Sequence, residues 1–131
     1  MEILEDNPRI SVVIATTNRA GILDETIQSL KNQTLAPSET IVSVASDSDC
    51  SEATRSDPHI KVVIGPPGST YQRNTGMQAV DTASKYILFL DDDMALSRFY
   101  LRNCANVMRD CPGSVGVGYN QAGRRANHRR I

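Results

Sequence analysis

Residues 86–93 read Y-I-L-F-L-D-D-D, and this stretch decides the fold class. Five apolar residues in a row are too few for a helix, and they are typical of a strand that is buried on both faces of a sheet. Residues 10–15, I-S-V-V-I-A, form a second short run rich in β-branched residues. We predict that both runs are buried strands.

Outward from these runs, strand-like and helical segments alternate along the chain. The other predicted strands are 39–45, 61–64 and 114–119, and the predicted helices are 22–30, 51–55, 69–83 and 97–111. This alternation predicts an α/β fold with a mostly parallel, doubly wound, Rossmann-like sheet that carries helices on both faces. The helix after residue 68 should open with a capping box of Ser69 and Gln72 and should bury Met77.

Length and composition fit one soluble domain. The chain has 131 residues and a net charge of −1, which gives no reason to expect a nucleic-acid partner. No apolar run approaches the ~20 residues of a transmembrane segment, and the acidic N-terminus does not resemble a signal peptide. Three cysteines without CxxC spacing predict neither a disulfide framework nor a zinc site. We expect a cytoplasmic protein, with a position at the cytoplasmic face of a membrane left open.

We divide the chain into an N-terminal extension (1–9), one domain (10–119) and a loose basic tail (120–131). In a parallel sheet, ligands bind beyond the carboxyl ends of the strands. Polar residues crowd the segments that should meet there, which are 16–19, 46–49, 65–70 and 91–93.

The acidic run offers the clearest chemistry at this edge. Three adjacent carboxylates repel one another, and a hard divalent cation such as Mg²⁺ or Mn²⁺ would relieve that repulsion. Asp91 and Asp93 are the first and third residues of a turn, so they could share one cation. The alternative is a solvated acidic turn.

Three other segments suit a nucleotide. Arg73 and Asn74 fall in the first turn of a predicted helix, where free backbone N–H groups favour a phosphate oxygen. The S-D-S-D run at 46–49 has acceptors for a base N–H or ribose hydroxyls, and T-T-N-R at 16–19 could hold a base edge. Each segment is also compatible with an ordinary polar turn.

Five segments match a known pattern when they are taken in order. They are S-V-V-I-A-T-T-N-R (11–19), I-x-S-L-x-x-Q (27–33), E-T-I-V (39–42), Q-R-N-x-G (72–76) and Y-I-L-F-L-D-D-D (86–93). Together they resemble the nucleotide-binding half of family 2 glycosyltransferases, which have the GT-A fold. The resemblance implies a site for a nucleoside-diphosphate sugar, most often a UDP-sugar.

The resemblance also implies roles for particular residues. The implied donor-nucleotide residues are Thr16, Thr17, Asn18, Asp47, Asp49, Arg73, Asn74, Asp91 and Asp92. The implied ligands of Mg²⁺ or Mn²⁺ are the DxD acids Asp91 and Asp93, and the resemblance favours Asp93 as the direct ligand. The family's V-D-D-G-S reads S-V-A-S-D-S-D here, so the choice between Asp47 and Asp49 stays open.

The reaction implied is inverting transfer of a sugar to a hydroxyl group of a sugar, lipid or protein acceptor. The family's catalytic base is a carboxylate in the second half of the domain, whereas Asp110 is the only acid after Asp93 and does not match it. The general base is therefore unassigned, and we expect an incomplete GT-A-like domain. The alternative is a non-catalytic nucleotide-sugar-binding module, or a half-domain completed by a partner or by self-association into a homo-oligomer.

Overall fold

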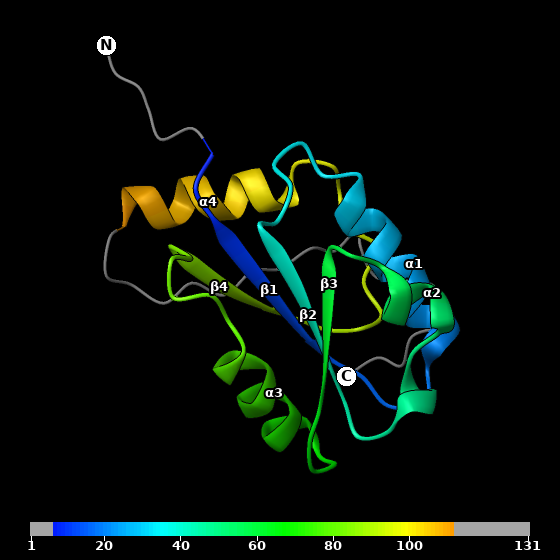
Figure 1. The fold of residues 1–131 in the computed structure, drawn as a ribbon. Coiled ribbons are helices and arrows are strands. Elements are labelled where there is room, and N and C mark those ends of the chain that lie inside the picture. The colour runs from blue at the N-terminus through cyan, green and yellow to red at the C-terminus, as the bar shows by residue number, and fades with distance from the viewer. Residues whose placement is uncertain (1–6, 112–131) are drawn as a thin grey trace.

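The computed structural model describes residues 7–111, and its strands form one parallel sheet in the order β3-β2-β1-β4 (Figure 1). The strands are β1 (Ile10–Ala15), β2 (Glu39–Val44), β3 (Ile60–Ile64) and β4 (Tyr86–Leu90). The predicted parallel α/β architecture is confirmed. The predicted strand 114–119, the tail 120–131 and most of the extension lie outside the described residues.

The register of the sheet aligns the carboxyl ends of its strands. Ala15 of β1 lies opposite Ser43 of β2, and Ile14 lies opposite Leu90 of β4. The residues that follow β1, β2 and β4 therefore emerge at one edge, which we call the carboxyl edge.

Helices cover both faces of this sheet, as predicted. They are α1 (Ala20–Lys31), α2 (Glu52–Ser56), α3 (Ser69–Gln78) and α4 (Tyr100–Asp110). The face that carries α1 and α4 holds the main core, to which β1 contributes Val12 and Ile14, α1 contributes Leu23 and Leu30, and α4 contributes Leu101. Helix α3 packs on the opposite face (Figure 1).

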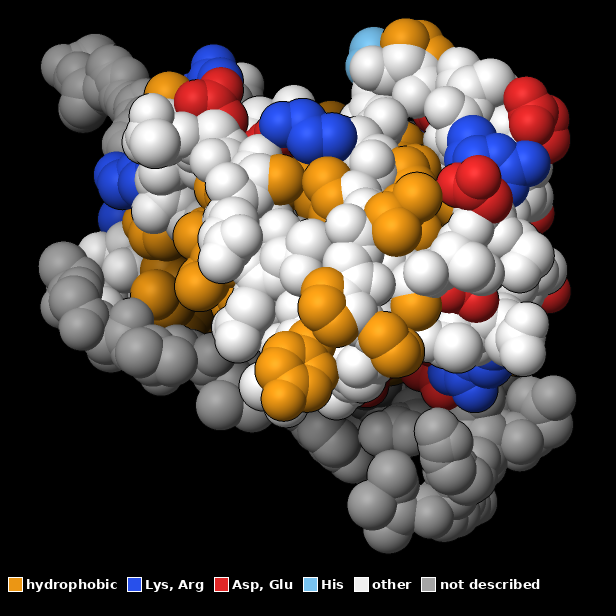
Figure 2. Space-filling view, turned by 60° about the horizontal axis from the view of Figure 1, so that its bottom comes forward, with side chains coloured by type: hydrophobic (Ala, Val, Ile, Leu, Met, Phe, Trp, Pro, Cys, Tyr) orange, Lys and Arg blue, Asp and Glu red, His pale blue; other side chains and the backbone are white. Residues whose placement is uncertain are grey.

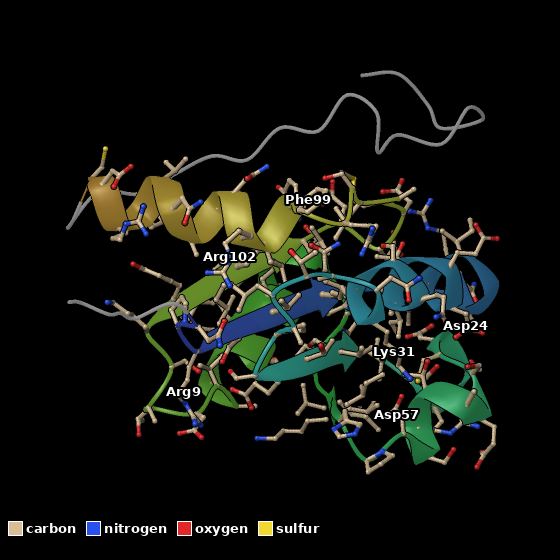
Figure 3. All side chains as sticks on the ribbon, turned by 90° about the horizontal axis from the view of Figure 1, so that it is seen from above. Arg9, Asp24, Lys31, Asp57, Phe99 and Arg102 are labelled. Atoms are coloured by element: carbon tan, nitrogen blue, oxygen red, sulfur yellow. The ribbon has the colours of Figure 1, made fainter. Side chains whose placement is uncertain are left out.

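Polar contacts fix α2 and the turn after it against α1. The Asp24 carboxylate of α1 accepts hydrogen bonds from the Ser51 and Thr54 hydroxyls at 2.8 and 3.1 Å. Lys31 and Asp57 point toward one another near the other end of α1, with Nζ and Oδ2 2.5 Å apart (Figure 3). The segment after β2 is thereby held against α1.

The structure corrects the prediction for α3. The N-cap is Gly68, with φ of 119°, rather than Ser69, and the helix ends at Gln78. Met77 is exposed, whereas Gln72 and Gly76 are buried. Gly76 allows α3 to approach the sheet, because a Cβ there would lie 2.6 Å from Val13 Cγ1. This close approach, rather than an apolar stripe, decides which side of α3 is buried.

Two smaller predictions near α4 are also wrong. The N-cap of α4 is Phe99 rather than Ser97, and Cys111, expected on the buried side, is exposed. All three cysteines are free thiols. Within residues 7–111, no helix has the length and hydrophobicity to span a membrane.

Figure 2 views the molecule from the end where α3 lies and shows hydrophobic side chains gathered on this face. The large apolar residues exposed on α3 and β4 are Tyr71, Met77, Ile87 and Phe89. The α3 side of the sheet is therefore less completely covered, within the described residues, than the side that carries α1. The prediction of a strand buried on both faces is wrong for β4, because Ile87 and Phe89 point to this less covered side and are exposed.

Candidate functional site

The carboxyl edge brings the predicted segments into direct contact. The Thr16 hydroxyl, after β1, donates a hydrogen bond to Asp92 Oδ2, after β4, at 2.8 Å. The Asn18 backbone N–H donates to Asp49 Oδ1, after β2, at 2.9 Å. Residues from three loops thus form one connected cluster, as the sequence predicted.

Asp92 is the buried centre of this cluster. It is 7% exposed, and its carboxylate accepts hydrogen bonds from Thr16 and from two nitrogens of Arg19, with Nε at 3.2 Å. The same guanidinium lies 3.3 Å from Asp93 Oδ2. The hydrogen bond to Asp92 raises the pKa of Arg19 and outweighs the effect of partial burial, so Arg19 stays charged. A buried carboxylate needs such a partner.

A residue of helix α1 holds the backbone of the acidic turn at 91–94 in place. The Thr26 hydroxyl is fully buried, donates to the Asp92 carbonyl oxygen at 2.7 Å and accepts from the Met94 N–H at 3.0 Å. Sequence reasoning missed the roles of both Arg19 and Thr26. Their signals were a base among the polar residues after β1 and a hydroxyl among the apolar positions of α1.

The two candidate acids after β2 lie in different environments. Asp49 is buried and accepts hydrogen bonds from the backbone N–H groups of Asn18, Ala45 and Ser46 at 2.9, 2.9 and 3.0 Å. Burial raises the pKa of Asp49, but the three donors together outweigh it and lower the pKa. Asp47 is exposed, and within the described residues no hydrogen bond engages its carboxylate. Asp49 therefore shapes the loop, and Asp47 is open to a ligand.

Asn18 supports this loop through its backbone conformation. Its φ of 55° is in the left-handed region, which asparagine adopts more readily than most residues. In this conformation its N–H faces Asp49. Thr17, beside it, is exposed and donates a hydrogen bond to Gln72 Oε1 at 3.3 Å.

Arg73 and Asp91 form the outer part of the site. Arg73 extends from the first half of α3, and its Nη2 lies 3.6 Å from Asp91 Oδ1. The two side chains are 44% and 60% exposed, and Asn74 beside Arg73 is also exposed. The carboxyl edge thus has a buried framework (Asp49, Gln72, Asp92) and an exposed layer (Thr17, Asp47, Arg73, Asp91).

The acidic turn can supply part of a cation's ligand set. Within residues 7–111, no three His, Cys, Asp or Glu side chains form a group that could hold a metal. Mg²⁺, however, is often bound by one or two carboxylates together with substrate phosphates. Of the two predicted ligands, Asp91 is exposed, whereas Asp93 is only 7% exposed and its Oδ2 lies 3.3 Å from the Arg19 guanidinium. Asp110 is exposed at the end of α4, where it pairs with Arg109 at 3.3 Å, and Figure 1 places this end away from the carboxyl edge.

The parallel sheet and the residues at its carboxyl edge indicate the class of protein to which this chain belongs. In open α/β sheets, ligands such as nucleotides bind beyond the carboxyl ends of the strands, and this is where the chain gathers its acids, hydroxyls and Arg73. A family model described as glycosyl transferase family 2 matches residues 11–130, and the chain belongs to this family. This match confirms the resemblance to family 2 glycosyltransferases that the five sequence segments indicated.

Several known proteins are similar to this chain. A GalNAc(5)-diNAcBac-PP-undecaprenol beta-1,3-glucosyltransferase of Campylobacter jejuni is 31% identical over 97 residues, covering 66% of this chain and 30% of that protein. S. aureus TarS 1–349 aligns with a TM-score of 0.62 at 22% identity, over 85% of this chain and 38% of TarS 1–349.

The complex of S. aureus TarS 1–349 with UDP aligns with a TM-score of 0.59 at 21% identity, over 78% of this chain and 32% of that one. These structures show the shared fold. The chain spans about a third of the length of the relatives that it matches.

Proposed function

We propose that this chain forms the donor site of a glycosyltransferase that binds a UDP-sugar with Mg²⁺ or Mn²⁺ and transfers the sugar, with inversion, to an acceptor hydroxyl. The observation that carries the proposal is the exposed layer of Thr17, Asp47, Arg73 and Asp91 at the carboxyl edge of a family 2 domain. UDP is bound by TarS, a structural neighbour of this chain.

Each part of the site has a task in this proposal. The loop at 16–18 and the free carboxylate of Asp47 would recognise the base and ribose, because they offer backbone groups and an acceptor. Arg73 would approach the diphosphate, since a guanidinium matches phosphate oxygens. Binding would replace its exposed pairing with Asp91 at 3.6 Å.

Asp91 and Asp93 would hold the divalent cation together with the diphosphate oxygens. Such a cation supplies positive charge that stabilises the departing nucleotide. The two acids have different ion-pair partners, because Asp93 faces Arg19 whereas Asp91 faces Arg73. We therefore expect Asp91 to be more easily available to the cation than Asp93, the acid that the family resemblance favours.

The acceptor class can also be proposed. The Campylobacter relative is named for an undecaprenol-PP-linked oligosaccharide, so a polyprenyl-diphosphate-linked sugar is the first acceptor to test. This acceptor would place the reaction at the cytoplasmic face of a membrane.

Calorimetric titration with UDP, with and without Mn²⁺, tests the donor site. The key variant is Asp91→Asn, and the matched control is Asp81→Asn, which breaks a similarly exposed ion pair with Arg9 of 3.3 Å. Ligand at a hundred times its dissociation constant should stabilise the fold by about 2.7 kcal/mol, so thermal unfolding gives an independent reading.

Manganese-dependent UDP binding that Asp91→Asn weakens and Asp81→Asn leaves intact supports the proposal. A folded parent chain that binds no UDP contradicts it. Binding of UDP-sugar without transfer to any lipid-linked, sugar or protein acceptor would favour a non-catalytic binding module instead.

A further inference from the structure

One side chain at the carboxyl edge uses its entire hydrogen-bonding capacity inside the domain. Gln72 of α3 is 2% exposed. Its amide nitrogen donates to the carbonyl oxygens of Thr16 and Ser43, each at 2.9 Å. Its amide oxygen accepts from the Gly68 N–H at 3.1 Å and from the Thr17 hydroxyl at 3.3 Å. A glutamine amide has two donor hydrogens and two acceptor lone pairs, so every position is filled.

The four partners come from three separate parts of the edge. Thr16 and Thr17 follow β1, Ser43 lies near the end of β2, and Gly68 is the N-cap of α3. Gly68 is local to Gln72, but Ser43, Thr17 and Thr16 lie 29, 55 and 56 residues away in sequence, so no local preference brings these three to the amide. Gln72 therefore sets the position of the β1 loop relative to the start of α3.

We infer that Gln72 is a positioning residue for the nucleotide: it holds the loop at 16–18 and the first turn of α3, with Arg73, at the spacing that a nucleoside diphosphate requires. This inference rests on the proposed function. Gln72 itself is too buried to contact the ligand. Its effect would pass through the Thr17 hydroxyl and the Thr16 carbonyl on one side, and through Arg73, the next residue of α3, on the other.

The chain contains a matched control for this inference. Gln33 is 8% exposed, and its amide nitrogen donates to the carbonyl oxygens of Ser29 and Ser97 at 3.1 and 2.7 Å. Its amide oxygen accepts from the Leu101 N–H at 3.0 Å. Gln33 joins the end of α1 to the start of α4, and it lies in the connection from α1 to the start of β2, where Ser38 bonds to the first residue of β1. It is thus a similar buried amide at the opposite edge of the sheet.

The test replaces each amide by a carboxylate of the same size. Gln72→Glu and Gln33→Glu both lose the N–H donors and turn an oxygen toward backbone carbonyls, so both should lower the melting temperature. UDP affinity is then measured by calorimetry at a temperature where circular dichroism shows each variant to be folded. We expect Gln72→Glu to weaken UDP binding by about tenfold or more, and Gln33→Glu to leave it unchanged.

A second variant and a measurement on the parent chain guard against loss of folding. Gln72→Met keeps the length of the side chain without its polar atoms and should weaken UDP binding similarly. In the parent chain, NMR should show that UDP slows hydrogen exchange of the Gln72 side-chain amide but not of the Gln33 amide.

The outcomes separate the two proposals. If the parent chain binds no UDP, the proposed function fails and the inference fails with it. If the parent binds UDP, the inference alone is overturned when both Gln72 variants keep parental affinity, when Gln33→Glu loses as much affinity, or when UDP leaves the exchange of the Gln72 amide unchanged.

Discussion

Replacing Gly76 by alanine tests how closely α3 must approach the sheet. A Cβ at this position would lie 2.6 Å from Val13 Cγ1, 3.5 Å from Ser43 Cβ and 3.7 Å from Ile41 Cγ2. Val13 is 1% exposed, and a β-branched side chain has little freedom to rotate away. Gly76→Ala must therefore push α3 outward or force Val13 from its rotamer.

Helix propensity and steric overlap act in opposite directions at this position. Alanine in a helix interior is favoured over glycine by about 1 kcal/mol. Overpacking a filled core costs about 1–3 kcal/mol. We expect Gly76→Ala to lower the free energy of unfolding by about 1 kcal/mol net, because the clash with Val13 costs more than the gain in helix propensity returns.

Gly21→Ala provides the control for helix propensity. Nothing lies within 4 Å of the Cβ that alanine would add at Gly21 in α1. This variant should gain up to about 1 kcal/mol, since only the propensity changes. The two glycine variants should thus change stability in opposite directions, and urea unfolding monitored by circular dichroism measures both.

A double-mutant cycle assigns the loss to a single contact. Val13→Ala removes the Cγ1 atom that meets the new Cβ, so Gly76→Ala should cost less in the Val13→Ala background than in the parent. If Gly76→Ala stabilises the chain as Gly21→Ala does, or if the two changes are additive, α3 does not depend on this approach and the reasoning is refuted.

Three further results are expected. Thr26→Val should lower the free energy of unfolding in urea by roughly 1–3 kcal/mol, since it removes the hydroxyl that the Met94 N–H and the Asp92 carbonyl share; an unchanged midpoint would contradict this. Because the pKa of Asp49 is lower in the folded state, its contribution to stability is present above the unfolded pKa of about 4 and is lost as the pH falls through the folded value, so Asp49→Asn should flatten the acid limb of a stability–pH curve. Arg19→Gln should lower the free energy of unfolding more in the parent chain than in an Asp92→Asn background, because in the parent it leaves the buried Asp92 carboxylate without its guanidinium. Equal losses of unfolding free energy in the two backgrounds would argue against a stabilising ion pair between Arg19 and Asp92.

The sequence predicted the strands and helices around the candidate site because short-range patterns encode them. Apolar runs of five or six residues mark β1 and β4, and helical spacing marks α1. The polar residues that follow parallel strands must then meet at one edge. This reasoning placed Asp49, Asp92 and Arg73 at the same edge, with no knowledge of their partners.

The sequence did not distinguish the buried acids from the exposed ones. Asp47 and Asp49 differ by two positions in an S-D-S-D run, and either could have faced a ligand. Three backbone N–H groups converge on Asp49, and that convergence depends on the left-handed Asn18 in another loop. Similarly, Asp92 looks like its neighbours in the sequence but differs from Asp91 by the partners that bury it.

By itself, the sequence determined the order of strands and helices, the parallel sheet and the edge where the acids gather, because these follow from the periods of hydrophobic residues and the alignment of strand ends. Only the tertiary structure decided which side chains form the framework and which face a ligand. Arg19 and Asp92 are 73 residues apart, and Gln72 and Thr16 are 56 apart. Contacts between residues so far apart in the sequence depend on how α1 and α3 pack against the sheet, and no local sequence pattern predicts them.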